Sequence, residues 1–538
     1  MKIKRFFPLL TVLVGALTLS GCSIIFDIID DIDDDNQRTD IDFNVDKIDV
    51  DGKTIIQKTY TDIAKNSPYL VDYCPTSGEV KLLIIPVWFN DSNRFITSNT
   101  FKDNVREDIK TAYLGTTEET GWHSVKTYYE EESSGALTID GTVSDWYEVN
   151  YSYITVGENG SITDELVRNA TDWYFTNNPS DNRSNYDSDN NGFIDGIMLI
   201  YAAPNYASLN NKNYKNLWAY CYWLQDERET SEAIPNTYFW ASYDFMYSKR
   251  DAISITGSSY GYGNTTYCNI DAHTYIHEMG HVFGLDDYYD YSDNEYNPAG
   301  GFSMQDYNVG GHDPYSVMAL GWANPYVVTG NSKVTIGTFQ KTRDLIVVSS
   351  SWNGGGSPFD EYLIFELYSP TGLNQFDVRH NYSGIQGPNK VGIRLWHVDG
   401  RLAYSTDVKR VDNYYEPVFS PTQLTSNPND SRNIYGVTHA FSNTYNDKDY
   451  GSVLGKNYYD YNLLQLIRND KTATFRPAED LMSTDLFSEG SYALTDFSSQ
   501  FVKGGNNKMN NDDSLDWKFK ININGSGEDA IAEIEIIL

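Results

Sequence analysis

The sequence is short of positive charge. Forty lysine and arginine residues stand against 75 aspartate and glutamate residues, which gives a formal net charge of −35 over 538 residues at pH 7. A surface with this balance repels a phosphate backbone, so we exclude nucleic acid as a partner. Hydrophobic residues still make up 40% of the chain, an ordinary value for a protein that buries a core, so wholesale disorder is excluded as well.

Cysteine is also scarce, and its pattern limits disulfide bonding. The four cysteines are Cys22, Cys74, Cys221 and Cys268. Because three remain once Cys22 is set aside, a complete disulfide framework is excluded. Cys221 and Cys268 could pair outside the cell, and Cys74 is expected to be a buried thiol.

Long apolar runs are confined to the N-terminus. Lys2, Lys4 and Arg5 precede an apolar segment at 6–19, which is typical of a secretory signal and too short for a stable membrane span. The segment ends in Leu-Ser-Gly-Cys, which resembles the bacterial lipobox. We therefore predict a lipoprotein signal at 1–21 and a diacylated Cys22 that anchors the mature chain to the extracellular face of the bacterial cell membrane.

The next stretch, 22–52, is dense in aspartate and poor in aromatic residues. Such a composition repels itself and extends, so we predict an acidic tether rather than a specific calcium site. We expect a catalytic domain at 53–325 and a β-rich region at 326–538.

Histidine occurs only eight times, yet His273, His277 and His281 fall within nine residues of one another. On a helix, His277 and His281 share one face, and two imidazoles on one face can bind one zinc ion. A catalytic zinc keeps one position open for water, and Glu278 stands beside the first ligand to take a proton from that water. A His273/His277 pair is geometrically possible, but it lacks this glutamate, so His273 is expected to pack or support the site.

Gly284 predicts the end of this helix, because glycine readily adopts the positive φ of a helix C-cap. The returning chain then brings an aspartate to the metal as a third ligand. Spacing favours Asp287, with the adjacent Asp286 left open as the alternative. Cys74 could instead cap the zinc as an inhibitory thiolate, a weaker interpretation than a plain buried thiol.

A second oxygen-rich motif lies upstream, at 187–196. Its Asp187, Asp189, Asn191 and Asp195 fall on ligand positions of an EF-hand-like loop, with a glycine at the tight turn. Position twelve is Met198 instead of a glutamate, so the loop is incomplete and the following segment reads as a buried strand. We predict a structural calcium ion here.

Downstream of the zinc motif, Met304 is placed to form a methionine turn, an apolar floor below the metal. Peptide hydrolysis also calls for a second donor to the oxyanion. The candidates are Tyr307, His312 and Tyr315.

The remaining pattern predicts an α+β fold. We expect a buried strand at 81–89, helices at 99–113 and 125–130, and a strand at 136–147 with a turn at Asp140 and Gly141. Alternating segments at 333–339, 344–350, 361–368 and 392–398, and a terminal hairpin, predict a sandwich-like C-terminal region. His397 and Asp399, at a strand end, are expected to be structural.

These segments together resemble the immune inhibitor A type of secreted bacterial metallopeptidases, which are related in motif to the metzincins. The resemblance runs from Pro75 to Leu402 and rests on VKLLIIPVWF, DSDNNGFIDG, HEMGHVFGLDD, GGFSMQDYN, GGHDPYSVMALGW, EYLIFELYSPTGLNQFD and GIRLWHVDGRL. It implies a metzincin-like zinc endopeptidase that acts on proteins and is stabilised by calcium. The chain departs from the family pattern at Asp286, where a proline is common, and at Tyr288, where an acidic residue often follows the ligand.

We therefore expect a surface-anchored zinc metalloendopeptidase with protein or peptide substrates, and a monomer is favoured. The rival is a surface adhesin that keeps the fold without turnover. The intact Glu278 favours the enzyme, because a binding protein has no chemical need for that carboxylate.

Overall fold

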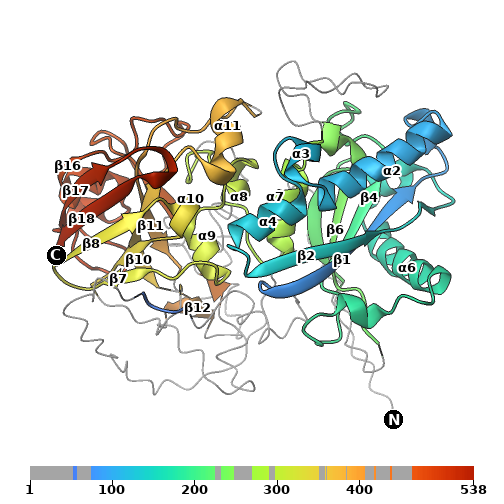
Figure 1. Ribbon diagram of the computed structural model, residues 1–538, viewed down its shortest axis with the longest axis horizontal. Coiled ribbons are helices and arrows are strands. Elements are labelled where there is room, and N and C mark those ends of the chain that lie inside the picture. The colour runs from blue at the N-terminus through green and yellow to red at the C-terminus, as the bar shows by residue number, and fades with distance from the viewer. Residues whose placement is uncertain are drawn as a thin grey trace, which may run out of the picture.

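The computed structural model describes residues 53–56, 74–224, 232–247, 270–289, 297–350, 358, 360–382, 384–400, 402–405, 417–419, 437–438 and 463–538. The predicted signal, Cys22, the acidic tether and Cys268 lie outside these residues. Among the residues that the structure describes, no helix combines the length and the apolar composition needed to cross a membrane. Figure 1 shows an N-terminal half built on one sheet, a C-terminal half built mostly of strands, and several helices between them.

The N-terminal half is organised around a mostly parallel sheet. Its order is β2-β1-β4-β6-β5, with β3 also paired to β1, and β5 alone runs antiparallel to its neighbour. The strands are β1 (Gly78–Trp88), β2 (Leu137–Val143), β3 (Tyr147–Glu148), β4 (Ile197–Tyr201), β5 (Tyr220–Trp223) and β6 (Thr237–Ser242). The predicted strand at 81–89 is confirmed as part of β1, whose apolar run is continuous because the sheet is covered on both faces.

The predicted turn at Asp140 and Gly141 is wrong. β2 runs straight through both residues, and Gly141 pairs with Leu82 of β1. A Cβ at Gly141 would lie 3.0 Å from Ile84 Cδ1. Gly141 therefore serves close packing within a sheet, although Asp-Gly is locally a strong turn signal.

Helices cover both faces of this sheet. Alternate residues of β1 belong to different cores: Leu82 and Ile84 pack on the side of α2, α4 and α7, and Leu83 and Ile85 pack on the side of α6. These helices are α2 (Asn99–Leu114), α3 (Thr117–Thr120), α4 (Val125–Glu132), α5 (Tyr153–Glu158), α6 (Ile162–Asn177) and α7 (His273–Val282). The predicted helices at 99–113 and 125–130 are confirmed as α2 and α4, and each begins at a serine N-cap whose side chain accepts a backbone N–H.

The C-terminal half is a sandwich of two sheets, as predicted. One sheet has the order β15-β11-β10-β9-β7 and the other β16-β17-β18-β8, and a third, small sheet has the order β13-β12-β14. The strands are β7 (Tyr326–Val328), β8 (Ser332–Gly337), β9 (Ile346–Val348), β10 (Glu361–Tyr368), β11 (Gly392–Asp399), β12 (Leu402–Ser405), β13 (Pro417–Phe419), β14 (Val437–Thr438), β15 (Leu464–Ile467), β16 (Gly490–Ala493), β17 (Lys518–Asn524) and β18 (Ile531–Ile537). The expected terminal hairpin is the antiparallel pair β17 and β18.

Short helical turns complete the chain. They are α8 (Met304–Tyr307), α9 (Pro314–Ala319), α10 (Phe339–Thr342), α11 (Gln375–Arg379), η1 (Ser92–Arg94), η2 (Arg183–Tyr186), η3 (Tyr243–Tyr247), η4 (Gly372–Asn374), η6 (Leu494–Gln500), η7 (Gly504–Asn506) and η8 (Gly527–Asp529). Figure 1 shows α7 to α10 between the sheet of the N-terminal half and the sandwich. With helices and sheets both present, the α+β fold class is confirmed.

The two halves share one apolar core. Strand β10 is buried along its whole length, and its alternate residues face different neighbours. Leu363 and Phe365 belong to the core between the two C-terminal sheets, whereas Tyr362 and Ile364 belong to the core that contains α7 and α4. Packing therefore continues across position 325, and the domain boundaries at 53 and 325 stay predictions.

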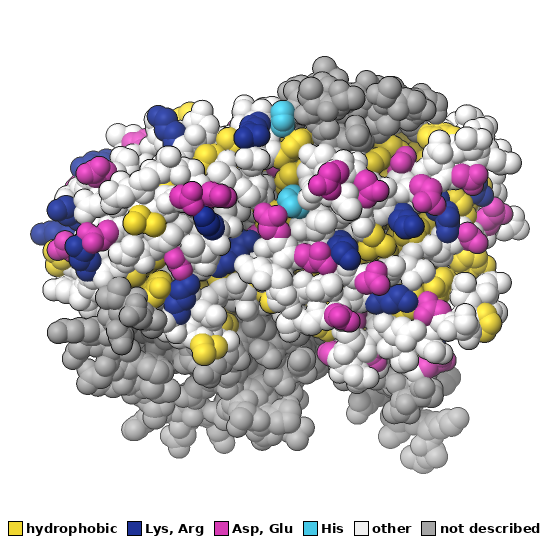
Figure 2. All heavy atoms as spheres, in the orientation of Figure 1, with side chains coloured by type: hydrophobic (Ala, Val, Ile, Leu, Met, Phe, Trp, Pro, Cys, Tyr) yellow, Lys and Arg dark blue, Asp and Glu magenta, His cyan; other side chains and the backbone are white. Residues whose placement is uncertain are grey.

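Charged side chains are spread over the face of the molecule that Figure 2 shows. Figure 2 shows acidic and basic side chains interspersed across one face of the molecule, over both halves. On this face the charge gathers in no single patch of either sign.

Candidate metal centre

Helix α7 carries the zinc motif at the centre of the molecule, and all ten of its residues are buried. It ends as predicted. Gly284 adopts φ 100°, and the N–H of Leu285 donates to the carbonyl of Gly280 at 3.0 Å. This turn sends the chain back toward the helix and carries Asp287 to the two histidines.

Three ligand atoms converge at this point. The Nε2 atoms of His277 and His281 lie 3.2 Å apart, and Asp287 Oδ1 lies 2.8 Å from the first and 3.3 Å from the second. Zinc bonds of about 2.0–2.2 Å in a tetrahedron separate ligand atoms by roughly 3.3–3.6 Å, so two separations nearly match and the third is shorter. The donor set therefore fits zinc. The described metal-binding group contains Asp287 and does not include Asp286.

Backbone carbonyls orient both imidazoles. His277 Nδ1 donates to the carbonyl of Met304, and His281 Nδ1 donates to the carbonyl of Leu285, each at 2.7 Å. A proton held on Nδ1 leaves Nε2 with its lone pair toward the metal position. Each carbonyl thus selects the tautomer that a metal ligand needs.

The electrostatics of the group favour a cation between its members. Burial alone would raise the pKa of Asp287, but His281 and His277 hold it well below its usual range. Burial alone would lower the pKa of His281, but Asp287 raises it to about 10. The Asp287 carboxylate therefore favours positive charge between these atoms, which a proton on His281 supplies and a metal ion would replace.

Glu278 lies beside the ligand atoms, and one of its carboxylate oxygens is free to accept a proton. Its side chain is 3% exposed, and within the described part of the chain Oε2 has no hydrogen-bond partner. Burial raises the pKa of this carboxyl to about 7, against the opposing effect of His281 and His277. A buried carboxylate oxygen without a partner is suited to receive a proton from a water or a substrate.

Comparison with known proteins agrees with this geometry. Residues 90–306 match the family described as immune inhibitor A peptidase M6, catalytic domain. These residues form an immune inhibitor A-type metallopeptidase domain. The match includes α7, Asp287 and Met304. A search of curated proteins gave no significant match to the chain.

Met304 of this peptidase domain acts on the site through its backbone. Its side chain is fully buried in the core that contains α7, and its carbonyl accepts the proton of His277 Nδ1. Directly after it, Gln305 packs against Gly280 of α7, where a Cβ would collide with the Gln305 side chain. Sequence reasoning missed Gln305, and the one signal available was a glycine between the two histidine ligands.

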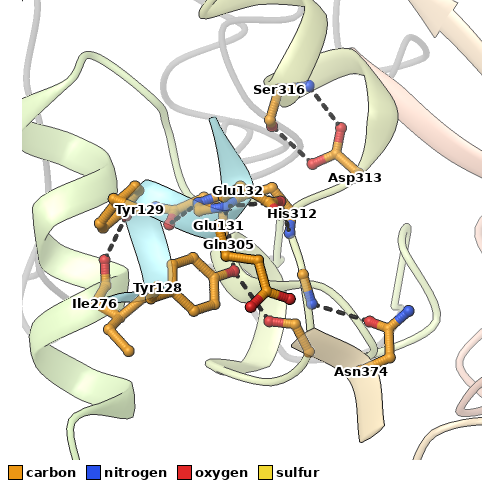
Figure 3. A network of polar contacts seen from close by, with 12 residues as sticks. Tyr128, Tyr129, Glu131, Glu132, Ile276, Gln305, His312, Asp313, Ser316 and Asn374 are labelled. Carbon is orange, nitrogen blue, oxygen red and sulfur yellow. Dashed lines mark hydrogen bonds and ion pairs between the residues drawn. The ribbon is translucent and has the colours of Figure 1, made fainter. Parts of the chain in front are cut away.

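The three candidate oxyanion donors fall in different surroundings. His312 is fully buried, with Nε2 3.2 Å from Gln305 Oε1 and Nδ1 3.5 Å from Glu132 Oε1, as the network in Figure 3 shows. Tyr315 is buried in the same core, and Tyr307 is half-buried with its ring 6.4 Å from that of Tyr289. Both ring nitrogens of His312 thus face other buried side chains, with the Tyr128 hydroxyl 3.3 Å from Nδ1, and the oxyanion role stays a prediction for all three.

In the predicted calcium loop, two carboxylates accept hydrogen bonds from backbone N–H groups of the same loop. Asp187 accepts the N–H groups of Asn191 and Gly192 at 2.9 and 3.0 Å, and Asp195 accepts that of Ser188 at 2.9 Å. Asp187, Asp189 and Asp195 each offer an oxygen to one group that could hold a cation. The side-chain oxygen of Asn191 instead accepts the N–H of Phe193. Strand β4 follows, with Met198 buried within it, as the incomplete motif predicted.

The remaining predicted residues do not belong to the group of ligand atoms. Cys74 donates its N–H to the carbonyl of Val282, the last residue of α7, and its thiol lies beside the carbonyl of Pro75. Cys221 is buried on β5, where burial, followed by the charge of Glu278, raises the pKa of its thiol. His397 pairs with Glu361 at 2.8 Å in the C-terminal half.

Proposed function

We propose that this peptidase domain is a zinc endopeptidase that hydrolyses internal peptide bonds of proteins. One observation carries the proposal: Nε2 of His277, Nε2 of His281 and Oδ1 of Asp287 converge beside a glutamate with an unpartnered oxygen. Two imidazoles and one carboxylate form a ligand set that leaves a tetrahedral zinc one open position.

Glu278 acts as the general base in this proposal. A zinc ion at the site acidifies water and polarises the scissile carbonyl. Oε2 of Glu278 accepts a proton from the attacking water and later delivers it to the leaving amine. The carbonyls of Met304 and Leu285 keep the imidazole rings of His277 and His281 in a fixed orientation. Little reorganisation of these rings therefore accompanies the reaction.

Strand β5 supports an extended substrate. Among the described strands it is the outermost of the sheet beside β6, and its Cys221 is close enough to Glu278 for the carboxylate to raise the pKa of the thiol. A peptide that pairs with a sheet edge is held through its main chain, so it can extend to both sides of the cleaved bond. This arrangement favours an endopeptidase over an enzyme that trims chain ends.

We also propose a structural calcium ion at Asp187, Asp189 and Asp195, with Asn191 in the same loop. Gly196, which ends this loop, packs against Leu82 of β1 and Val282 of α7. A cation that ties the loop together would therefore stabilise the packing against the zinc helix.

For location, we propose that Cys22 is lipidated and that residues 22–52 hold the enzyme away from the outer face of the membrane. Thirty-one residues of self-repelling chain extend to roughly 100 Å at most. The support for this proposal is the N-terminal sequence alone.

The decisive experiment compares the mature chain with Glu278→Ala on unfolded casein, with zinc and calcium present. We expect cleavage by the parent, a loss of about 10²–10⁴-fold in the variant, and near one zinc per chain in both. A folded, zinc-loaded parent that cleaves nothing in a broad peptide library would favour the catalytically silent adhesin. A parent without zinc would overturn the metal assignment.

A further inference from the structure

The segment Gly310–His312 is held by three successive backbone hydrogen bonds. The N–H of Gly310 donates to Asp377 Oδ2 at 2.9 Å, that of Gly311 to Asn374 Oδ1 at 3.0 Å, and that of His312 to Glu132 Oε1 at 2.8 Å. Figure 3 shows Asn374 and Glu132 reaching this segment from opposite sides. Two of the three acceptors belong to the C-terminal half, so that half fixes this segment of the N-terminal half.

Hydrogen bonds connect the segment Gly310–His312 to the proposed zinc ligand His277 through Met304. The carbonyl of Gly311 accepts the N–H of Met304 at 3.2 Å, and the carbonyl of Met304 accepts the proton of His277 Nδ1 at 2.7 Å. Gly310 also has φ +64°, and a Cβ there would lie 2.8 Å from Asn374 Oδ1. Only a glycine allows both this backbone conformation and this close approach.

Asp377 also contacts the first residue of α7, the helix that carries His277. Its carboxylate oxygens lie 3.2 and 3.3 Å from Nε2 of His273, the first residue of α7. The other ring nitrogen of His273 faces Asp271 Oδ1 at 2.6 Å. The ring is stacked between Trp122, 3.9 Å away, and Tyr382, 4.5 Å away. His273 therefore stands where the two halves meet, with partners from both.

We propose that Asp377, on α11 of the C-terminal half, is a positioning residue of the metal centre. Its fully buried carboxylate contacts His273 at the start of α7 and accepts a hydrogen bond from the segment Gly310–His312, which is linked to His277. The C-terminal half thereby completes the zinc site without contributing a ligand. This inference rests on the proposed zinc at His277, His281 and Asp287. Supporting hydrogen bonds of this kind typically change metal affinity or activity by about 10–100-fold.

The test is the rate of zinc release from the mature chain to a chromophoric chelator. We expect Asp377→Ala to release zinc about 10–100-fold faster than the parent. Its kcat should fall at saturating zinc while KM stays within about twofold, because the substrate is not touched. The visible spectrum of the cobalt-substituted variant should also change, since it reports ligand geometry.

Asp485→Ala is the matched control. Asp485 is also a buried aspartate of the C-terminal half, but its partners are Arg468 and the N–H of Met482, which lie in that half. Its zinc release should equal that of the parent. If Asp377→Ala releases zinc at the parental rate, or if both variants accelerate release equally, the positioning role is overturned.

A second variant covers the case in which Asp377→Ala does not fold. Asp377→Asn keeps one oxygen for the N–H of Gly310 and places an amide toward His273, so it should release zinc faster than the parent, although less so than Asp377→Ala. This experiment distinguishes a failure of the positioning role from a failure of the proposed peptidase function. A parent that binds zinc but cleaves nothing overturns the peptidase alone, whereas zinc release at the parental rate in the folded Asp377 variant overturns the positioning role alone.

Discussion

Gln305 occupies the space that a side chain at Gly280 would need. The amide group of Gln305, itself hydrogen-bonded to His312 at 3.2 Å, presses against the Gly280 backbone between the two histidine ligands. In an exposed helix interior, alanine in place of glycine typically stabilises by about 1 kcal/mol. Here the collision reverses the sign of that effect.

We therefore expect Gly280→Ala to lower the free energy of unfolding by about 1–3 kcal/mol and to weaken zinc binding. The Gln305→Ala background removes the obstacle, so the same substitution should be neutral or stabilising there. Urea unfolding of the four proteins in this double-mutant cycle measures the coupling. Equal effects of Gly280→Ala in both backgrounds would contradict the contact.

Asp287 and Asp286 should behave differently. Asp287→Ala removes a ligand, so zinc content after dialysis should fall well below one per chain. Asp286→Ala should retain zinc, since Asp286 is outside the described ligand group. Metal analysis of both variants decides the question that spacing left open, and zinc loss in Asp286→Ala alone would reverse the assignment.

Calcium should stabilise the chain through the loop at 187–196. At a free concentration 100 times its dissociation constant, an ion bound only by the folded state adds about 2.7 kcal/mol. A calcium chelator should therefore lower the thermal midpoint of the parent. Asp187→Asn should abolish this response. Asp181→Asn, a nearby change at a carboxylate that accepts the hydroxyls of Tyr174 and Tyr186, should keep it. A calcium response that survives in Asp187→Asn would place the ion elsewhere.

Asp306 should make stability depend on pH. Burial raises the pKa of this carboxyl to about 7, and within the described residues its Oδ1 has no hydrogen-bond partner. A raised folded-state pKa means that the folded chain holds a proton that the unfolded chain has lost. The stabilisation of the folded chain by protonated Asp306 is therefore complete below the unfolded-state pKa of about 4. It is lost as the pH rises through the folded-state pKa of about 7.

The measurement is urea unfolding of the parent and of Asp306→Asn from pH 5 to pH 8. The difference in unfolding free energy, parent minus variant, should fall by about 1.4 kcal/mol per pH unit up to about pH 7 and then level off. A difference that does not vary with pH would show that Asp306 does not titrate in this range.

Cys22→Ser should prevent lipid attachment. The parent, grown with labelled fatty acid, should carry label and sediment with membranes, whereas the variant should carry none. Label that persists in Cys22→Ser would show that another residue carries the lipid. An unlabelled parent would show that the lipobox-like segment is an ordinary signal.

Much of the centre of the site follows from local sequence. His277 and His281 share a face because the helical repeat brings residues four apart together, and Gly284 ends the helix because glycine tolerates φ 100°. The strand at 81–89 is a nearly continuous apolar run because both faces of its sheet are covered. In each case the physical cause acts within a few residues, so the pattern is visible in the sequence.

The supporting contacts had no such local signal. Asp377 reaches His273 across 104 positions, and Met304 reaches His277 across 27. The turn predicted at Gly141 failed for the same reason, since the neighbour that fixes its role is Ile84 on another strand.

The amino-acid sequence by itself predicted His277, His281 and Glu278 as site residues and the alternation of strands and helices, because periodicity and glycine conformation are local properties of the chain. Only the tertiary structure decided which carbonyls orient the histidines, that Asp287 meets them, and that the C-terminal half supports α7. Those relationships depend on which distant surfaces pack together, and packing is a property of the whole fold.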